Sequence, residues 1–105
     1  MSIEFDGFDW DHGNIGHCAK HGVSKDEVEH VLENMSFFIP DPYPHEPRRR
    51  TAGQTLEGRH VFIVFMHRNV GRDLLLRPIS ARYMHEKEVN EYERIKEAMA
   101  NPADR

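Results

Sequence analysis

Near the N-terminus, the spacing of apolar residues changes from alternation to a helical period. Residues 3–10 alternate apolar and acidic positions, and the phase slips at Gly7, which predicts a strand with a bulge or kink. Asp11 can cap a short helix that runs to about Lys20, and Gly22 is suited to end it. The chain is therefore predicted to open with a strand followed by a helix.

A second helix is predicted directly afterwards. Ser24 and Glu27 form a capping-box pattern, and apolar residues then recur at helical spacing: Val28, Val31, Leu32 and Met35. Residues 36–39 form a brief strand candidate. The prolines in residues 41–47 predict a loop.

Three longer strands are predicted in the second half of the chain. They cover residues 48–55, 59–67 and 73–82, and the short connections between them imply antiparallel hairpins. Residues 61–66 are apolar at every position, which predicts the centre of the sheet. Pro78 lacks a donor for the strand ladder and indicates a bulge or an edge.

A last helix is predicted for residues 85–100. Its apolar stripe consists of Val89, Tyr92, Ile95 and Met99. The pattern as a whole predicts an α+β fold with an N-terminal strand and two helices, a central antiparallel sheet and a C-terminal helix. A length of 105 residues fits one domain with one site.

Composition narrows the class of protein. A hydrophobic content of 38% and a charged content of 30% are typical of a soluble globular chain. No apolar run approaches the roughly 18 residues that span a bilayer, and the N-terminus lacks a signal-type segment. We therefore expect a cytoplasmic protein that does not bind membranes. The single Cys18 lies within the first predicted helix, where a packing role is favoured over a nucleophilic one.

Positive charge is concentrated in the middle of an otherwise acidic chain. Between His45 and His85 eight arginines face three acidic residues, a balance of +5, whereas the rest of the chain has six Lys/Arg against fifteen Asp/Glu, a balance of −9. The planar donor fork of arginine suits bidentate contact with phosphate or carboxylate. The segment from Arg48 to Arg82 is therefore predicted to bind an anion.

Several short motifs resemble the BrnT toxin family. The likeness extends over about residues 5–94, and its most specific parts are the His-Gly-Val-Ser turn at 21–24 and the Ser-Ala-Arg strand end at 80–82. Further matching residues are Phe8, Asp9, Trp10, Asp11, Asn14, Asp26, Glu27, Val28, Glu29, Glu46, Arg48, Arg50, Gly58, Arg59, Glu86, Tyr92 and Glu93. The sequence departs from the family in residues 10–20, which carry Gly13, Asn14 and His17 in place of an Ala/Lys-rich helix.

The resemblance implies a RelE-like fold and a metal-independent ribonuclease that stops translation, with RNA as its substrate and no cofactor. It also implies a cognate antitoxin that neutralises the toxin. The antitoxin is expected to be a ribbon-helix-helix protein, and its DNA-binding part represses the operon, so the toxin meets DNA only through it.

The candidate catalytic residues are Lys20, His21, Arg50 and Arg82. Metal-free RNA cleavage needs groups that move protons at the 2′-OH and at the leaving 5′-oxygen, together with cations that hold the charge of the phosphorane. Lys20 and His21 lie at the end of the first predicted helix, although the ring of His21 can equally serve as a helix cap. The alternative for the arginine-rich strand is a solvated edge protected by charge.

Other arginines are candidates for substrate binding: Arg48, Arg59, Arg68 and Arg77. Arg48 and Arg50 share one face of a strand and Arg49 takes the other, because side chains alternate with a period of two. Glu46 can pair with one of these arginines and fix its orientation.

Arg82 is expected to contact phosphate, with a salt bridge to Glu86 as the alternative. Arg77 lies five residues earlier and points to the opposite face if the strand is regular. A bulge at Pro78 can bring the two arginines together.

The histidines do not predict a metal site. His17 and His21 are four residues apart, as paired zinc ligands often are, but Cys18 follows His17 where a zinc-protease helix has glutamate. The other histidines are scattered and are expected at the surface or at a partner contact. Trp10 and the Phe37–Phe38 pair can stack on bases, although their neighbourhood favours a place in the core.

Two classes of function follow. The first is a ribonuclease toxin whose arginine-rich surface binds RNA through phosphate contacts. The second is a non-catalytic binding module of the same fold, whose arginines dock an acidic protein partner. Lys20 and His21 beside the arginines favour chemistry, whereas the acidic remainder of the chain disfavours tight RNA binding.

Overall fold

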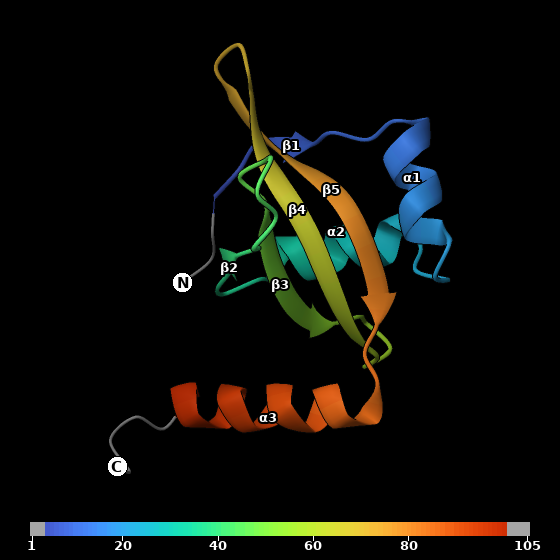
Figure 1. Ribbon diagram of the computed structural model, residues 1–105, viewed down its shortest axis with the longest axis vertical. Helices are drawn as coiled ribbons and strands as arrows, with labels where there is room; N and C mark the ends of the chain where they lie inside the picture. The colour runs from blue at the N-terminus through green and yellow to red at the C-terminus, as the bar shows by residue number, and fades with distance from the viewer. Residues whose placement is uncertain (1–3, 101–105) are drawn as a thin grey trace.

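The computed structural model describes residues 4–100 and contains three helices and a five-stranded mixed sheet (Figure 1). The predicted α+β fold is confirmed. The strands lie in the order β1-β5-β4-β3-β2. In chain order the elements are β1 (Gly7–Phe8), α1 (His12–Ala19), α2 (Lys25–Glu33), β2 (Ile39–Pro40), β3 (Arg49–Gln54), β4 (His60–Val70), β5 (Asp73–Tyr83) and α3 (Glu86–Ala100).

The N-terminal strand is much shorter than predicted and runs parallel to its neighbour. Of residues 3–10 only two form β1, and residue 3 lies outside the described part of the chain. The backbone N–H groups of Asp6 and Asp9 still donate to β5 carbonyls, at 2.8 and 2.9 Å. The strand ends there because the next residues turn away from the sheet edge to cap α1. The sheet is therefore antiparallel only from β5 to β2.

Both predicted helix starts are confirmed by capping boxes. In α1 the side chain of Asp11 accepts from the backbone N–H of Asn14, and the Asn14 side chain accepts from the backbone of Asp11. In α2 Ser24 and Glu27 form the same reciprocal pair. Each box satisfies N–H groups that have no partner within the helix.

Tight turns close the two predicted hairpins. Gly58 and Gly71 adopt φ values of 86° and 60°, a left-handed conformation that side chains disfavour. Strand β4 extends past the predicted end at residue 67, because Val70 still pairs with Asp73 before the turn at Gly71. This hairpin is the long arm at the top of Figure 1.

One face of the sheet carries the hydrophobic core. Val61, Ile63 and Phe65, at alternate positions of β4, are fully buried in a cluster with side chains of α1 and α2. Helix α2 passes behind the strands in Figure 1. Burial of such side chains contributes about 1.5–3 kcal/mol each, so this layer is the main support of the fold. Cys18 belongs to the same cluster, as predicted, and burial raises the pKa of its thiol to about 11.

A bulge in β5 decides which arginines share a face. Val64 pairs with Ser80, but the next β4 residue, Phe65, pairs with Pro78, so one β5 residue is left over. Arg77 and Arg82 consequently pair with Met66 and Phe62, which are four residues apart on β4 and point to the same side. The predicted bulge at Pro78 is confirmed, and it places Arg77 and Arg82 together.

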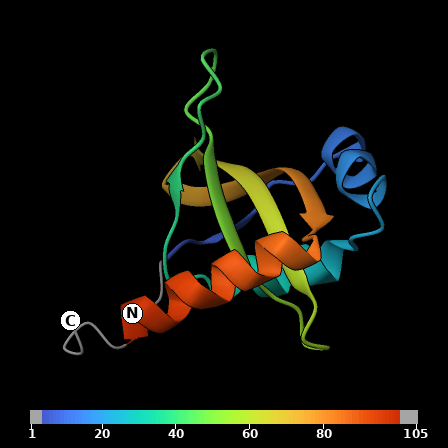
Figure 2. The ribbon, with the colours of Figure 1, turned by 60° about the horizontal axis from the view of Figure 1, so that its bottom comes forward.

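Helix α3 crosses the other face of the sheet without joining the core (Figure 2). None of its residues is buried, and Ile95 and Met99 of the predicted apolar stripe are 45% and 54% exposed. Polar contacts hold it: His60 Nε2 lies 2.9 Å from a Glu93 oxygen, and Lys96 lies 3.5 Å from the Gln54 side chain. Helix α3 thus lies over this face of the sheet without burying any of its residues.

Candidate functional site

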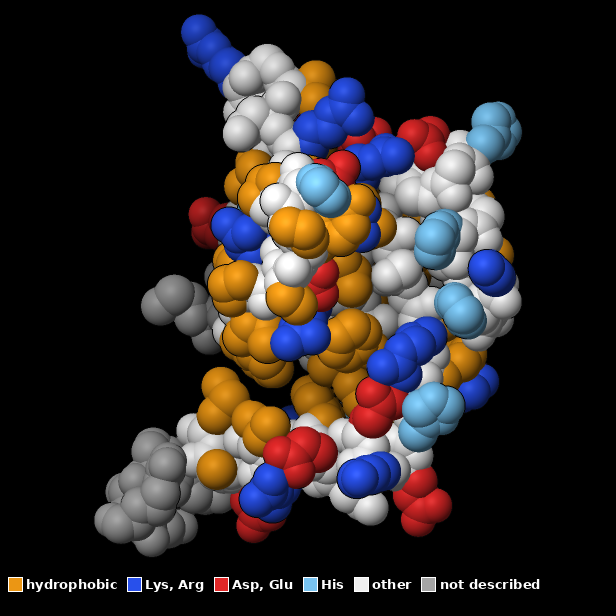
Figure 3. All heavy atoms as spheres, viewed as in Figure 1, with side chains coloured by type: hydrophobic (Ala, Val, Ile, Leu, Met, Phe, Trp, Pro, Cys, Tyr) orange, Lys and Arg blue, Asp and Glu red, His pale blue; other side chains and the backbone are white. Residues whose placement is uncertain are grey.

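Four arginines from three strands gather on the sheet face opposite the core, which we call the arginine face. Arg50 comes from β3, Arg68 from β4, and Arg77 and Arg82 from β5. The register places them on one side, because Arg50 pairs with Val64, and Phe62, Val64, Met66 and Arg68 alternate with the core residues of β4. Figure 3 shows cationic side chains among apolar ones on this side of the molecule.

Arg82 is held by a carboxylate from α3. Its Nη1 and Nη2 donate to the two oxygens of Glu88 at 2.8 and 2.7 Å, a fork-to-fork pair. These hydrogen bonds, with another from the backbone N–H of His85, lower the pKa of Glu88 to about 2. The salt bridge considered from the sequence therefore exists, but its carboxylate is Glu88 and not Glu86, because Glu88 stands at the third position of α3 and also caps it.

Arg50 has donors to spare. Its buried Nε has no hydrogen-bond partner among the described residues. Its guanidinium carbon lies 6.0 Å from the centre of the Phe62 ring, and that of Arg82 lies 5.3 Å from the same ring. Two cations thus share one aromatic ring. An unpaired buried donor is costly unless a ligand satisfies it, so Arg50 is a candidate for binding an anion.

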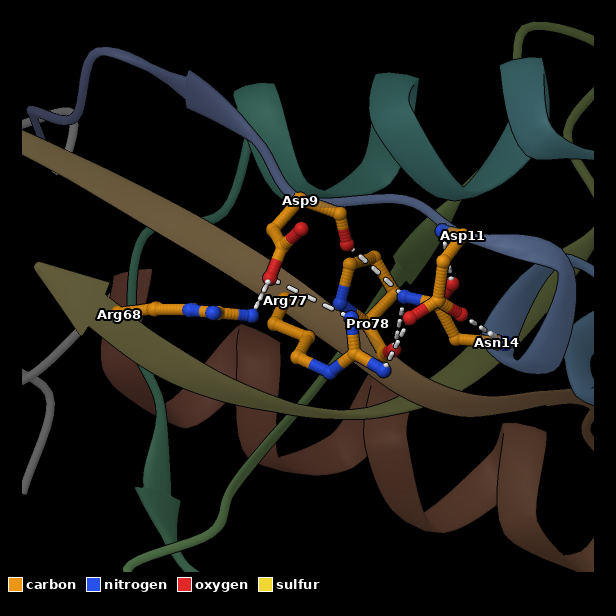
Figure 4. Close-up of polar contacts among 6 residues, drawn as sticks. All are labelled: Asp9, Asp11, Asn14, Arg68, Arg77 and Pro78. Carbon is orange, nitrogen blue, oxygen red and sulfur yellow. Dashed lines mark hydrogen bonds and ion pairs between the residues drawn. The ribbon is translucent and has the colours of Figure 1, made fainter. Parts of the chain in front are cut away.

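Arg68 and Arg77 are paired with two carboxylates from the segment after β1 (Figure 4). Asp9 accepts from Arg68 at 2.6 Å and from Arg77 at 3.3 Å, and Asp11 accepts from Arg77 at 2.9 Å. Hydrogen bonds to the Asn14 backbone and to Arg77 lower the pKa of Asp11, and the bond to Asp11 raises the pKa of Arg77. The pairing of Asp9 and Asp11 with arginines was not predicted, since these carboxylates lie more than fifty residues away in the sequence.

Asn14 connects this acidic segment to the bulge. Its side-chain amide donates to the carbonyl oxygens of Asp9 and Pro78, both at 2.9 Å, and the residue is only 5% exposed. Asn14 therefore holds α1 and its preceding segment beside the point where β5 changes register (Figure 4).

The remaining substrate-binding candidates lie elsewhere. Arg48 pairs with Glu46 at 2.8 Å, and its guanidinium stacks 3.8 Å from the ring centre of Tyr43. Arg59 stacks 3.4 Å from the ring centre of Tyr83. Tyr83 follows Arg82 and points to the opposite side of β5, so Arg59 is not part of the arginine face.

Lys20 and His21 are exposed in the turn that leaves α1. The following carbonyl, of Gly22, accepts from the Tyr83 hydroxyl at 3.3 Å, which places this turn on the core side of the strand end. No hydrogen bond or ion pair within residues 4–100 joins Lys20 or His21 to the arginine face. The structure thus brings Arg50 and Arg82 together but leaves the other two catalytic candidates at a neighbouring edge.

His60 is an imidazole on the arginine face whose role the sequence did not single out. It stands two residues before Phe62 on β4 and pairs with Gln54. Besides its contact with Glu93, its ring meets that of Tyr92 edge-on, with centroids 5.5 Å apart. A fixed imidazole on the same face as Arg50 and Arg82 has the chemistry of a proton-transfer group.

The aromatic candidates divide between core and surface. Trp10 donates to Glu29 at 2.9 Å, and Trp10 and Phe38 pack on the core, as expected. Phe37 instead lines a hollow under α3. Across the described residues no group of three or more His, Cys, Asp or Glu is placed to hold a metal ion. Nor does the described chain contain a helix long and apolar enough to cross a membrane.

Fold and surface together define a class: a small α+β protein with a cationic sheet face suited to an anionic polymer or an acidic partner. The chain belongs to the BrnT family, described as ribonuclease toxins of type II toxin–antitoxin systems, whose model matches residues 10–88. Membership indicates an RNA target and an antitoxin partner. A comparison with curated proteins finds no match.

Proposed function

We propose that the protein cleaves RNA on its arginine face without a metal ion and thereby stops translation. The observation that carries this proposal is the bulge at Pro78, which gathers Arg77 and Arg82 with Arg50 on one face, where the buried Nε of Arg50 has no partner. Family membership supports the ribonuclease activity. Cations of fixed charge suit a reaction in which negative charge builds on a phosphate.

Arg50 and Arg82 hold the scissile phosphate in this proposal. A phosphate presents two oxygens to the fork of Arg82 as Glu88 does, so it can replace the carboxylate. Arg50 supplies the second set of donors from across Phe62. Arg68 and Arg77, already paired with Asp9 and Asp11, bind the neighbouring phosphates more weakly, since those carboxylates must be displaced or bridged.

Two sets of groups compete for the proton transfers. Lys20 and His21 have suitable chemistry, but RNA must pass around the end of β5 to reach them. His60 lies on the arginine face, and Glu93 fixes its ring. Its position therefore favours His60 as the proton-transfer group. Lys20 and His21 would contact the RNA where it passes beyond the arginine face.

Single substitutions separate these roles. Arg50→Ala and Arg82→Ala should each lower the rate of RNA cleavage about 100-fold or more, the usual effect of losing one donor to a developing oxyanion. Arg72→Ala is the matched control, because it removes the same charge from an exposed hairpin turn. Equal losses in all three variants would show that only net charge matters.

The pH dependence of cleavage identifies the proton-transfer group. In His60→Gln the plot of cleavage rate against pH should lose the change that a proton-transferring imidazole produces. Lys20→Ala and His21→Ala should only weaken RNA binding. Activity should persist in EDTA, and a cell-free translation reaction should stop when the protein is added. Loss of cleavage in chelator with recovery in one divalent ion would overturn the metal-free mechanism.

A non-catalytic role has one observation in its favour. Three of the four arginines on the face are already paired with carboxylates of the chain itself, namely Asp9, Asp11 and Glu88. A surface of this kind is suited to an acidic protein segment. If wild-type protein binds its antitoxin tightly but neither cleaves nor binds RNA, this second candidate is correct.

We expect the antitoxin to bind the same face through an acidic segment. We also expect it to be a ribbon-helix-helix protein, and the toxin to contact DNA only through this antitoxin. Contact between opposite charges accelerates association at low ionic strength. Stopped-flow association should therefore slow as salt is raised, and Arg82→Ala should flatten that dependence. A rate that does not respond to salt would place the antitoxin on another surface.

A further inference from the structure

An apolar hollow lies between α3 and the sheet, directly beside the two arginines that share Phe62. Its volume is about 460 Å³. Ala52 and Phe62 form its floor on the sheet, Tyr92 and Ile95 form its wall on α3, and Phe37 closes one side. Figure 3 shows apolar side chains on both sides of the gap above α3.

The walls of the hollow are aromatic and incompletely packed. Phe37, Phe62 and Tyr92 are all half-buried, and Ile95 is 45% exposed although it belongs to the apolar stripe of its helix. Apolar surface that the fold itself leaves open is unfavourable in water unless something covers it. A flat ring that stacks on aromatic side chains fits such a space.

The charges around the hollow point to the kind of molecule that carries this ring. Arg50 and Arg82 both lie within about 6 Å of Phe62, so an apolar ring in the hollow would have two cations next to it. Of the two carboxylates at the rim, Glu91 is paired with Arg94 at 2.6 Å, and Glu88 occupies the fork of Arg82 until a phosphate replaces it. Lys87 adds a positive charge at the same rim. An apolar ring next to negative charge is the composition of a nucleotide.

We propose that this hollow binds one unpaired base of an RNA strand while Arg50 and Arg82 hold the adjacent phosphate. The inference rests on the proposed ribonuclease function and adds a base subsite to it. The subsite makes the enzyme act on single-stranded RNA, because a base must leave its stack to enter the hollow. It also makes α3 part of the substrate site.

The test uses a short fluorescent 2′-fluoro RNA, which lacks the 2′-OH nucleophile and cannot be cleaved, and a series in which one abasic residue is moved along the strand. Wild-type protein should lose affinity about tenfold at a single abasic position, the effect of one stacked base. Ala52→Leu places a larger side chain on the floor of the hollow without removing any contact. This variant should bind the intact RNA as weakly as the wild-type protein binds that abasic RNA. Its affinity should not fall further when the abasic RNA replaces the intact one.

Two variants serve as controls. Tyr92→Ala removes an aromatic ring on the α3 side of the hollow and should reduce the loss of affinity that the abasic residue causes. The conclusion then does not rest on a substitution in the sheet alone. Met99→Ala removes an exposed apolar side chain of the same helix away from the hollow and should behave as wild type. Circular dichroism establishes that each variant is folded.

Three results would overturn the inference, and they differ from one another. If the affinity is the same for every abasic position while Arg82→Ala still weakens RNA binding, the protein recognises phosphate but has no base subsite. If Ala52→Leu keeps the abasic effect but loses the antitoxin, the hollow serves the protein partner. If wild-type protein neither binds nor cleaves RNA, the proposed function fails, and the base subsite fails with it.

Discussion

Replacing Asn14 with alanine should destabilise the protein far more than its small side chain suggests. The Asn14 amide donates to the carbonyls of Asp9 and Pro78, and its oxygen accepts from the backbone N–H of Asp11 at 2.7 Å. Alanine leaves all three groups without this partner, and the bond to Pro78 is fully buried. Such hydrogen bonds contribute about 0.5–1.5 kcal/mol each, so we expect a loss of about 2–4 kcal/mol.

The free energy of unfolding in urea, measured at equal protein concentration, tests this value. Asn34→Ala is the matched control, because Asn34 also donates to a backbone carbonyl, that of His30 at 2.8 Å, but is exposed at the end of α2. We expect the control to cost less than about 1 kcal/mol, since water replaces an exposed partner. Equal costs at the two asparagines would refute the reasoning.

A second substitution separates the donor from the acceptor. Asn14→Asp keeps an oxygen for the Asp11 N–H but removes both donors and places a carboxylate against the Asp9 and Pro78 carbonyls. It should therefore be at least as destabilising as Asn14→Ala. A variant that is more stable than the alanine would show that the capping contact alone matters.

Three further predictions concern the core and α3. Gly53→Ala should lower the free energy of unfolding by about 1–3 kcal/mol, because its Cβ would lie 2.9 Å from a buried valine methyl of α2. A Cβ at Gly16 meets nothing within 4 Å, so Gly16→Ala should leave the stability in urea unchanged or raise it. Cys18, with a thiol pKa of about 11 and 1% exposure, should react with a thiol reagent only after unfolding. The pKa of Glu88 is lowered from 4.5 to about 2, so its pairing stabilises the fold above pH 4.5 and is lost as the pH falls toward 2. Carboxyl ¹³C NMR should show a midpoint near 2 that returns toward 4.5 in Arg82→Gln.

Local chemistry explains why much of the fold could be predicted. The capping box at Ser24 depends on neighbouring residues, and Pro78 indicates an irregular strand because it lacks a backbone donor, so both features are visible in the sequence. The first strand was predicted too long, because alternation alone does not show that the chain turns away from the sheet after Asp9, whose side chain binds Arg68. The helix α3 and the positions of its apolar stripe were predicted, but none of its residues is buried and the helix remains outside the core.

The candidate site was only half visible in the sequence. Segregated charge identified the arginines as candidates, and the resemblance to BrnT toxins predicted RNA as the substrate. It was pairing across strands that joined Arg50 to Arg82 over Phe62 and moved Arg59 to another surface. His60 gained its candidate role because α3 returns across β4, a contact between residues thirty-three positions apart.

The sequence by itself determined the order of the elements, the central place of β4 and the concentration of positive charge in one segment, because these depend on local period, turn residues and composition. The tertiary structure decided which arginines share a face, which carboxylates hold them and where an apolar hollow opens beside them. A single extra residue in β5 reverses the side to which every preceding side chain of that strand points. Such a reversal depends on the partner strand, so it is settled only when the sheet forms.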